Sequence, residues 1–193
     1  MRTFVMVAAA AILAGCSSGG AAVDADAGPA FIAYGTDFIA YDGWESTPLA
    51  SAQPSADGGI PTDPAGCALG HDTSTDRVGF LNRRPPHGST EFPVGTIFVK
   101  ELRKEGVAKA DWQVFAMVKR GGDYNRSGAK GWEWFELVPS ATEGAAPRIA
   151  WRGSGPPAGD GYGSPECGGC NGCHGGAANN DYVVSPQFDL KTY

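Results

Sequence analysis

The chain has 193 residues and a formal net charge of −6 at pH 7, from 15 Lys and Arg against 21 Asp and Glu. A chain with this charge lacks the basic surface that nucleic-acid phosphates require, so no nucleic-acid partner is expected. Without the N-terminal export segment described next, about 160 residues remain, which is enough for one domain with a single hydrophobic core.

The N-terminus has the form of a secretory signal. Arg2 precedes an apolar run over residues 4–14, which is too short to span a bilayer but suits the central region of a signal peptide. The run ends in Leu13-Ala14-Gly15-Cys16, which resembles the bacterial lipoprotein cleavage box, so we expect Cys16 to carry a lipid. Ser17 favours delivery to the outer membrane. We therefore expect a lipid-anchored protein on the periplasmic side; an ordinary cleaved signal with a stray cysteine is the alternative.

Composition divides the chain into three regions. Residues 1–15 form the signal, residues 16–29 are small and polar and form a flexible tether, and residues 30–193 form the domain. The domain begins with aromatic residues spaced three and four apart, which predicts a helix with one aromatic face: Phe31, Tyr34, Phe38 and Tyr41. Residues 47–75 are rich in Ser, Pro, Gly, Ala and Asp without a hydrophobic period, which predicts a long surface loop.

Strands are predicted in the middle and later parts of the domain. Segments rich in β-branched and aromatic residues, mostly bounded by Gly or Pro, lie at residues 77–81, 95–102, 112–119, 131–138 and 148–152. The short connections between them favour an antiparallel meander. The expected fold is mainly β, in the α+β class: an antiparallel sheet with an N-terminal helix and a C-terminal segment that carries the most specific motif of the chain.

That motif is Cys170-Asn171-Gly172-Cys173-His174, which has the C-x-x-C-H spacing of a c-type haem attachment site. The two thiols form thioethers to the haem vinyl groups, and the adjacent histidine becomes an axial ligand of the iron. Export supports this interpretation, because c-type haem is attached on the outer face of the bacterial inner membrane. We therefore predict one covalent haem c held by Cys170, Cys173 and His174.

Three other interpretations of the motif stay open from the sequence. The residues could form a glycine-rich loop with a disulfide and an incidental histidine. They could form a zinc site, for which the fourth ligand would have to come from far away in the chain. Together with Cys167 they have the spacing of an iron–sulfur fragment, but the fourth cysteine is missing.

The remaining cysteines predict a disulfide. Of the five cysteines, one is the lipid site and two are the haem sites, which leaves Cys67 and Cys167. Because unpaired thiols are uncommon in an oxidising compartment, we predict a Cys67–Cys167 bond. It would close a loop of about 100 residues and stabilise the fold by at most roughly 4–5 kcal/mol.

Several stretches, taken in order, resemble the cytochrome P-460 family, which is related to the cytochromes c′-beta. They are residues 92–101 (FPVGTIFVKE), residues 130–135 (KGWEWF), and the C-x-x-C-H motif followed by residues 180–183 (NDYV). The resemblance covers roughly residues 44–190. It implies a mainly β homodimer with a five-coordinate c-haem, His174 as the proximal ligand and an open distal iron site. Members oxidise hydroxylamine or bind nitric oxide and related small ligands.

The resemblance also implies a role for Lys100, which matches the lysine that is cross-linked to the haem in hydroxylamine-oxidising members. On a strand Lys100 shares a face with Phe98 and other apolar residues, so desolvation would lower its pKa and make the amine more nucleophilic. A lysine that extends into water at the strand end is the alternative. Phe98, Phe115 and Trp134 are candidates for an apolar distal pocket, although the sequence favours ordinary core packing for each of them.

The function expected from these residues is the binding or oxidation of small nitrogen species such as hydroxylamine or nitric oxide. Oxidation would need an unidentified redox partner and a base; the candidate bases are charged side chains that the sequence places on or near strands: Glu133, Glu136, Asp123 and Lys119. The alternatives are a gas-binding haem protein without turnover and a six-coordinate electron carrier. The carrier requires a sixth ligand, for which Met117 and His87 are candidates.

Overall fold

The computed structural model describes residues 30–49, 75–155 and 169–193 of the chain. The predicted lipoprotein signal and tether, the lipid site Cys16 and the Cys67–Cys167 disulfide lie outside these residues. Within the described ranges, no helix has the length and apolar character needed to cross a bilayer.

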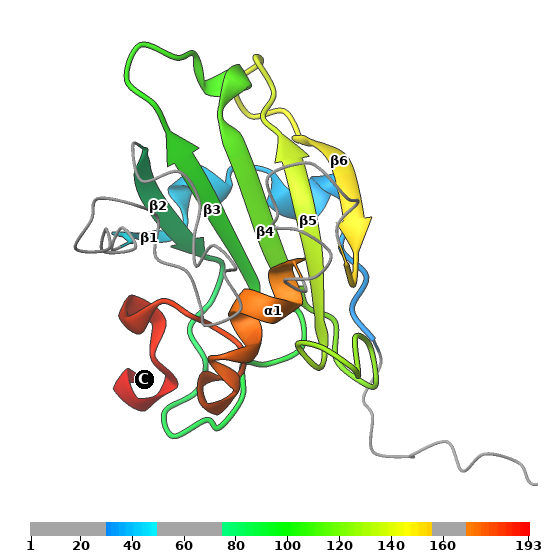
Figure 1. Ribbon diagram of the computed structural model, residues 1–193. Helices are drawn as coiled ribbons and strands as arrows, with labels where there is room; N and C mark the ends of the chain where they lie inside the picture. Colours follow the sequence, from blue (N-terminus) through cyan, green and yellow to red (C-terminus); the bar gives the residue numbers. More distant parts are fainter. Residues whose placement is uncertain (1–29, 50–74, 156–168) are drawn as a thin grey trace, which may run out of the picture.

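One antiparallel sheet of six strands forms the body of the domain, and its strands follow one another in chain order from β1 to β6 (Figure 1). The predicted meander is therefore confirmed, and each of the five predicted segments is a strand within a few residues of its expected bounds. The strands are β1 Glu45–Pro48, β2 Asp76–Leu81, β3 Ile97–Arg103, β4 Gln113–Lys119, β5 Trp132–Val138 and β6 Arg148–Gly153.

Strand β1 was not predicted from the sequence, which assigned its last two residues, Thr47 and Pro48, to the long loop. It pairs with β2 from Glu45 opposite Leu81 to Pro48 opposite Val78. Its four residues include one proline and no large apolar side chain, so the segment carries neither the period nor the composition of a buried strand. An edge strand tolerates both features, because only one side of its backbone needs partners.

The prediction of an N-terminal helix is wrong. The segment forms two short 3₁₀ turns, η1 Gly35–Phe38 and η2 Tyr41–Gly43, separated by Ala40 with φ of 54°. A left-handed residue cannot continue a right-handed helix, so the helix is interrupted at this point. The aromatic spacing instead serves two separate contacts, since Phe38 packs against Phe135 and Tyr41 against Phe80, each with ring centroids 5.4 Å apart.

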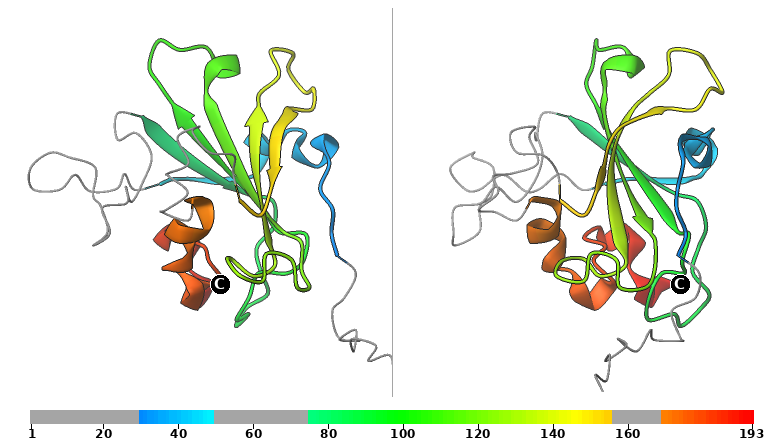
Figure 2. Two further views of the ribbon diagram at one scale, coloured as in Figure 1. Left: turned by 45° about the vertical axis from the view of Figure 1, so that its right-hand side comes forward. Right: turned by 90° about the vertical axis from the view of Figure 1, so that its right-hand side faces the viewer.

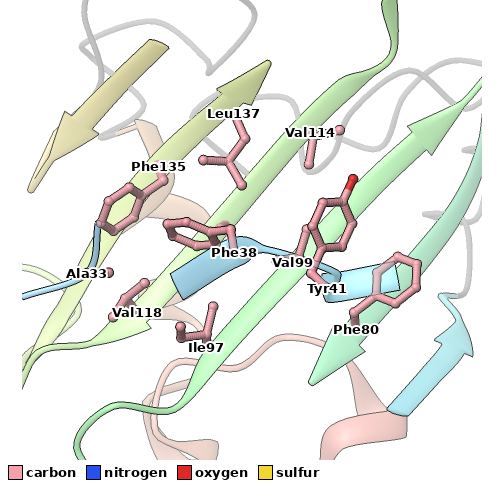
Figure 3. Packing of buried hydrophobic residues seen from close by; sticks show 11 residues of the cluster. Ala33, Phe38, Tyr41, Phe80, Ile97, Val99, Val114, Val118, Phe135 and Leu137 are labelled. Carbon is pink, nitrogen blue, oxygen red and sulfur yellow. The ribbon is translucent and has the colours of Figure 1, made fainter. Parts of the chain in front are cut away.

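The first face of the sheet is covered by this N-terminal segment. Figure 3 shows Phe38 and Tyr41 pointing into a core made by alternate residues of the strands. Its members from the sheet include Phe80, Ile97, Val99, Val114, Val118, Phe135 and Leu137. A polar contact also fixes this segment to the sheet, because Arg152 pairs with the buried Glu133 at 2.7 Å and donates to the Ala33 carbonyl at 2.6 Å.

The opposite face of the sheet is covered by the C-terminal segment, as the edge-on view in Figure 2 shows. This segment contains helix α1 Gly169–Gly175 and three 3₁₀ turns, Ala178–Asn180, Pro186–Phe188 and Leu190–Thr192. It packs on a second core whose sheet members are Leu81, Phe98, Met117, Trp132 and Trp134. Because both faces are covered, β3 to β5 are apolar on both sides, and this apolar character is why the sequence predicts them clearly.

Candidate functional site

Helix α1 places the whole motif on one turn against the sheet (Figure 1). Cys170, Cys173 and His174 stand at positions i, i+3 and i+4, which lie on one side of a helix. Cys170 packs half-buried against the second core, and Cys173 is exposed. Among the described cysteines neither forms a disulfide. The three side chains that the sequence predicted to act together are therefore neighbours in space.

His174 is held on two sides. Its Nδ1 lies 2.6 Å from the carbonyl oxygen of Tyr182, and its ring lies against the Trp134 indole, with centroids 4.6 Å apart. Burial lowers the pKa of His174 to about 4, against the raising effect of the Tyr182 carbonyl. The imidazole is therefore neutral at pH 7 and donates from Nδ1 to that carbonyl. Nε2 is then the unprotonated nitrogen, which is the form that binds a metal.

The carbonyl that accepts from His174 belongs to a strained turn. Asp181 and Tyr182 have φ of 49° and 66°, two consecutive left-handed residues that are not glycine. Such a conformation costs of order 1–3 kcal/mol per residue and persists only where the surroundings hold it in place. Asn180 contributes to this hold: its Nδ2 donates to the Val183 carbonyl at 2.8 Å, and its Oδ1 accepts from the Leu190 amide at 2.8 Å.

Asp181 is the main anchor of the turn. Lys119 Nζ donates to both of its carboxylate oxygens, at 2.6 and 2.8 Å, and the side chains of both residues are nearly inaccessible. The Phe92 amide and the Trp132 indole donate to the same carboxylate at 2.9 and 3.3 Å. Burial raises the pKa of Asp181, while Lys119 and these donors oppose the increase.

A cavity of about 700 Å³ borders this ion pair. It is lined by Lys119, Asp181, Tyr182 and the segment from Thr90 to Val94, and not by the cysteines or the histidine of the motif. The cavity therefore lies beside the anchor of the turn rather than at the motif itself.

Asn171, between the two cysteines, joins α1 to the connection between β4 and β5. Its Oδ1 accepts from Asn125 Nδ2 at 2.7 Å, the Trp134 indole at 3.0 Å and the Ala129 amide at 3.1 Å. Its Nδ2 donates to Asn125 Oδ1 at 3.1 Å and to the Ser154 carbonyl at 2.7 Å. The motif helix is thus docked through one amide side chain in addition to its apolar contacts.

Lys100 lies on the motif face of β3, between Gly79 of β2 and Phe115 of β4. Its ammonium group lies 5.5 Å from the centroid of the Phe115 ring and interacts electrostatically with both motif cysteines. Burial, and then repulsion from Arg77, lowers the pKa of Lys100 to about 8. The side chain is half-buried rather than extended into water, so the desolvated environment expected from the strand pattern is present.

The three aromatic candidates for a distal pocket have different surroundings. Phe98 is packed within the core, with its centroid 5.0 Å from both Phe92 and Phe188. Trp134 contacts His174 itself. Phe115 is the one beside Lys100. Of the candidate sixth ligands, Met117 is buried in the second core and His87 is exposed.

The candidate bases differ in burial and in their ion-pair partners. Glu133 is buried and paired with Arg152 and Arg120, at 2.7 and 3.3 Å. Lys119 is buried in its ion pair with Asp181. Glu133 and Lys119 are therefore both buried in ion pairs. Asp123 is an exposed partner of Arg126, at 3.7 Å.

Glu136 is the remaining candidate base. On β5 it is paired with Phe115, which is paired with Lys100, so it stands in the same cross-strand row on the motif face.

Sequence reasoning missed the two polar anchors of the site, the Asn171 amide and the Lys119–Asp181 pair. Their partners lie 37 to 62 residues apart in the chain, at Trp134, Asn125 and Lys119. The only available signal was a polar residue inside the motif and the Asn-Asp-Tyr run after it, and neither indicates which partner it meets.

Comparisons with protein-family models, with curated proteins and with solved structures found no match to this chain. Within the described residues, no group of three or more His, Cys, Asp or Glu side chains is arranged to hold a metal ion by itself. The donor set does fit a haem, because two thiols and a neutral imidazole with its Nδ1 already engaged stand together on one helical turn.

Proposed function

We propose that this chain is a mono-haem c-type cytochrome that binds or oxidises small nitrogen species. The observation that carries the proposal is the hydrogen bond from His174 Nδ1 to the Tyr182 carbonyl, since His174 shares helix α1 with both cysteines. A histidine that binds a metal generally donates its other ring N–H to a carbonyl or carboxylate, which fixes the tautomer and raises the basicity of the ligand. In this fold the Tyr182 carbonyl supplies that hydrogen-bond acceptor.

The cysteines supply the attachment. Each thiol would add across one vinyl group of a haem, with a C–S bond formed, the S–H bond broken and its proton passed to the neighbouring vinyl carbon, so no oxidant would be needed. Cys170 and Cys173 would form these two thioethers, and His174 would bind the iron through Nε2. When bound, the haem supplies an iron centre that takes small ligands and exchanges electrons.

The remaining residues of the motif face support chemistry on nitrogen ligands. Lys100 presents a half-buried amine with a lowered pKa beside both cysteines, which is where the resemblance to the cytochrome P-460 family would place the haem cross-link. Glu136, in the same cross-strand row, is the carboxylate we assign as proton acceptor. Phe115 between them would keep that region apolar. Trp134 contacts the proposed proximal ligand and therefore belongs to the side of His174.

The cellular setting in the proposal follows from the N-terminal signal. Lipidated at Cys16, the domain would be held at the periplasmic side of a bacterial membrane, where an external redox partner collects or supplies electrons. A homodimer, as the family resemblance implies, is part of the same proposal.

Expression with residues 1–15 replaced by a cleavable export signal, in a host that matures c-haem, tests the proposal. We expect one covalent haem by mass spectrometry, and two thioethers by the pyridine haemochrome spectrum. Cys170→Ala with Cys173→Ala provides the matched control without attachment. A ferrous Soret band strongly shifted to the red would indicate a modified macrocycle and Lys100 as the link, provided that Lys100→Ala abolishes the shift. An ordinary high-spin spectrum would indicate gas binding, and a low-spin one an electron carrier. A chain that matures with no haem and a Cys170–Cys173 disulfide would overturn the proposal.

A further inference from the structure

We infer that Asn171 is a positioning residue for His174: its amide holds the Trp134 indole against the imidazole while it docks the motif helix on the β4–β5 connection. The inference rests on the proposed function, because it concerns the histidine that would bind the haem iron. The C-x-x-C-H pattern itself requires no particular residue at the position that Asn171 occupies.

The Asn171 side chain uses both ends of its amide. Three donors converge on Oδ1 and two acceptors on Nδ2, from Asn125, Ala129, Trp134 and Ser154. An amide oxygen has two lone pairs and an amide nitrogen two protons, so the group is fully used. A carboxylate would lack both donors, and an alanine would leave the polar partners on the β4–β5 connection without their bonds.

The connection is shaped around this amide. Asn125 has φ of 52°, and its side chain bonds both Asn171 and the Trp132 carbonyl, at 3.1 Å for the latter. A Cβ at Gly128 would lie only 2.3 Å from the Asn171 Cγ, so only a glycine fits there. A glutamine at position 171 would push one more methylene into the same contact. The site therefore selects asparagine by size as well as by hydrogen bonding.

The effect on His174 passes through Trp134. The indole N–H is tied to Asn171, and the indole ring lies against the imidazole with an interplanar angle of 51°. The Tyr182 carbonyl fixes Nδ1, and the Trp134 indole packs against the imidazole ring. Loss of the Asn171 amide would remove the polar tether of the indole, which is otherwise held by core packing alone, and so broaden the orientations that Nε2 adopts.

The experiment compares Asn171→Ala, Trp134→Phe and the double variant in the haem-loaded protein. Asn179→Ala is the matched control, since Asn179 is an exposed asparagine of the same C-terminal segment. The readout is the iron–histidine stretching band of the ferrous protein in the resonance Raman spectrum, together with the pyridine haemochrome spectrum, which reports both thioethers. We expect each single variant to keep both thioethers but to lower and broaden the band. The double variant should change it no further than the larger single effect, because both substitutions break one path.

Three results would overturn the inference: an unchanged band in Asn171→Ala, additive effects in the double variant, or an equal effect in Asn179→Ala. A second readout needs no haem. In the chain with Cys170→Ala and Cys173→Ala, the Trp134 indole proton should exchange with solvent roughly tenfold faster once Asn171→Ala is added. If wild-type protein takes up no haem, the proposed function fails; the indole exchange still decides whether Asn171 holds Trp134, and unchanged exchange would overturn that step.

Discussion

Asp181→Asn is the substitution that tests how the turn behind His174 is held. Asparagine keeps the shape of the side chain and tolerates a left-handed backbone, so the change removes the charge with little other disturbance. It leaves the Lys119 ammonium buried, with 6% of its side chain exposed; among the described residues only the exposed Glu91 carboxylate, at 3.7 Å, stays as a counter-charge. The perturbation therefore leaves a buried charge with only a weak, solvent-exposed counter-charge.

The expected cost follows from that geometry. Removal of one partner of a buried ion pair costs about 3–5 kcal/mol, and the nearby Glu91 places this case at the lower end, about 3 kcal/mol. For a domain of this size, 1 kcal/mol corresponds to about 2–4 °C in Tm, so Tm should fall by roughly 6–12 °C. Such a loss is a large part of the total stability of about 5–15 kcal/mol that is usual for a domain.

Urea and thermal unfolding of the haem-free chain measure the effect. Addition of Lys119→Met to Asp181→Asn should recover part of the loss, because the unpaired charge is removed. Asp123→Asn, at an exposed carboxylate, serves as the control and should change stability by no more than about 0.5 kcal/mol. If Asp181→Asn costs less than about 1 kcal/mol, or if the double variant is less stable than Asp181→Asn alone, the buried pair does not anchor the turn as argued.

Three further predictions concern the same face of the sheet. After reductive methylation with ¹³C, the NMR resonance of Lys100, assigned by its loss in Lys100→Arg, should titrate near pH 8. Because the unfolded chain holds that proton more tightly, the contribution of Lys100 to the free energy of unfolding rises between pH 8 and the usual pKa of lysine. Tyr182→Gly should be about 1 kcal/mol more stable to urea than Tyr182→Ala, because only glycine adopts the observed φ without cost. At the exposed control position, Val184→Ala should instead be more stable than Val184→Gly. Gly128→Ala should lower stability by about 1–3 kcal/mol through its clash with the motif asparagine, and Gly155→Ala, where a Cβ meets nothing within 4 Å, should not.

The sequence by itself determined strands β2 to β6 and the residues of the motif. β-Branched and aromatic segments such as 95–102 and 131–138 predict strands because adjacent residues in them are buried on opposite faces, and that pattern is local. The C-x-x-C-H spacing likewise places two thiols and an imidazole on one turn of α1 without help from the rest of the chain. The position of Lys100 on the motif face also follows from strand alternation, since Phe98 and Lys100 share a side.

Only the tertiary structure decided where the N-terminal aromatics turn and what holds the histidine. Phe38 and Tyr41 suit an α-helix by spacing, but they pack against rings on different strands, and Ala40 turns left-handed between them. The partners of His174, at Tyr182 and Trp134, and of Asp181, at Lys119, are set by how the C-terminal segment crosses the sheet. Hydrogen bonds between residues tens of positions apart depend on the packed arrangement of elements, and no local pattern in the chain encodes them.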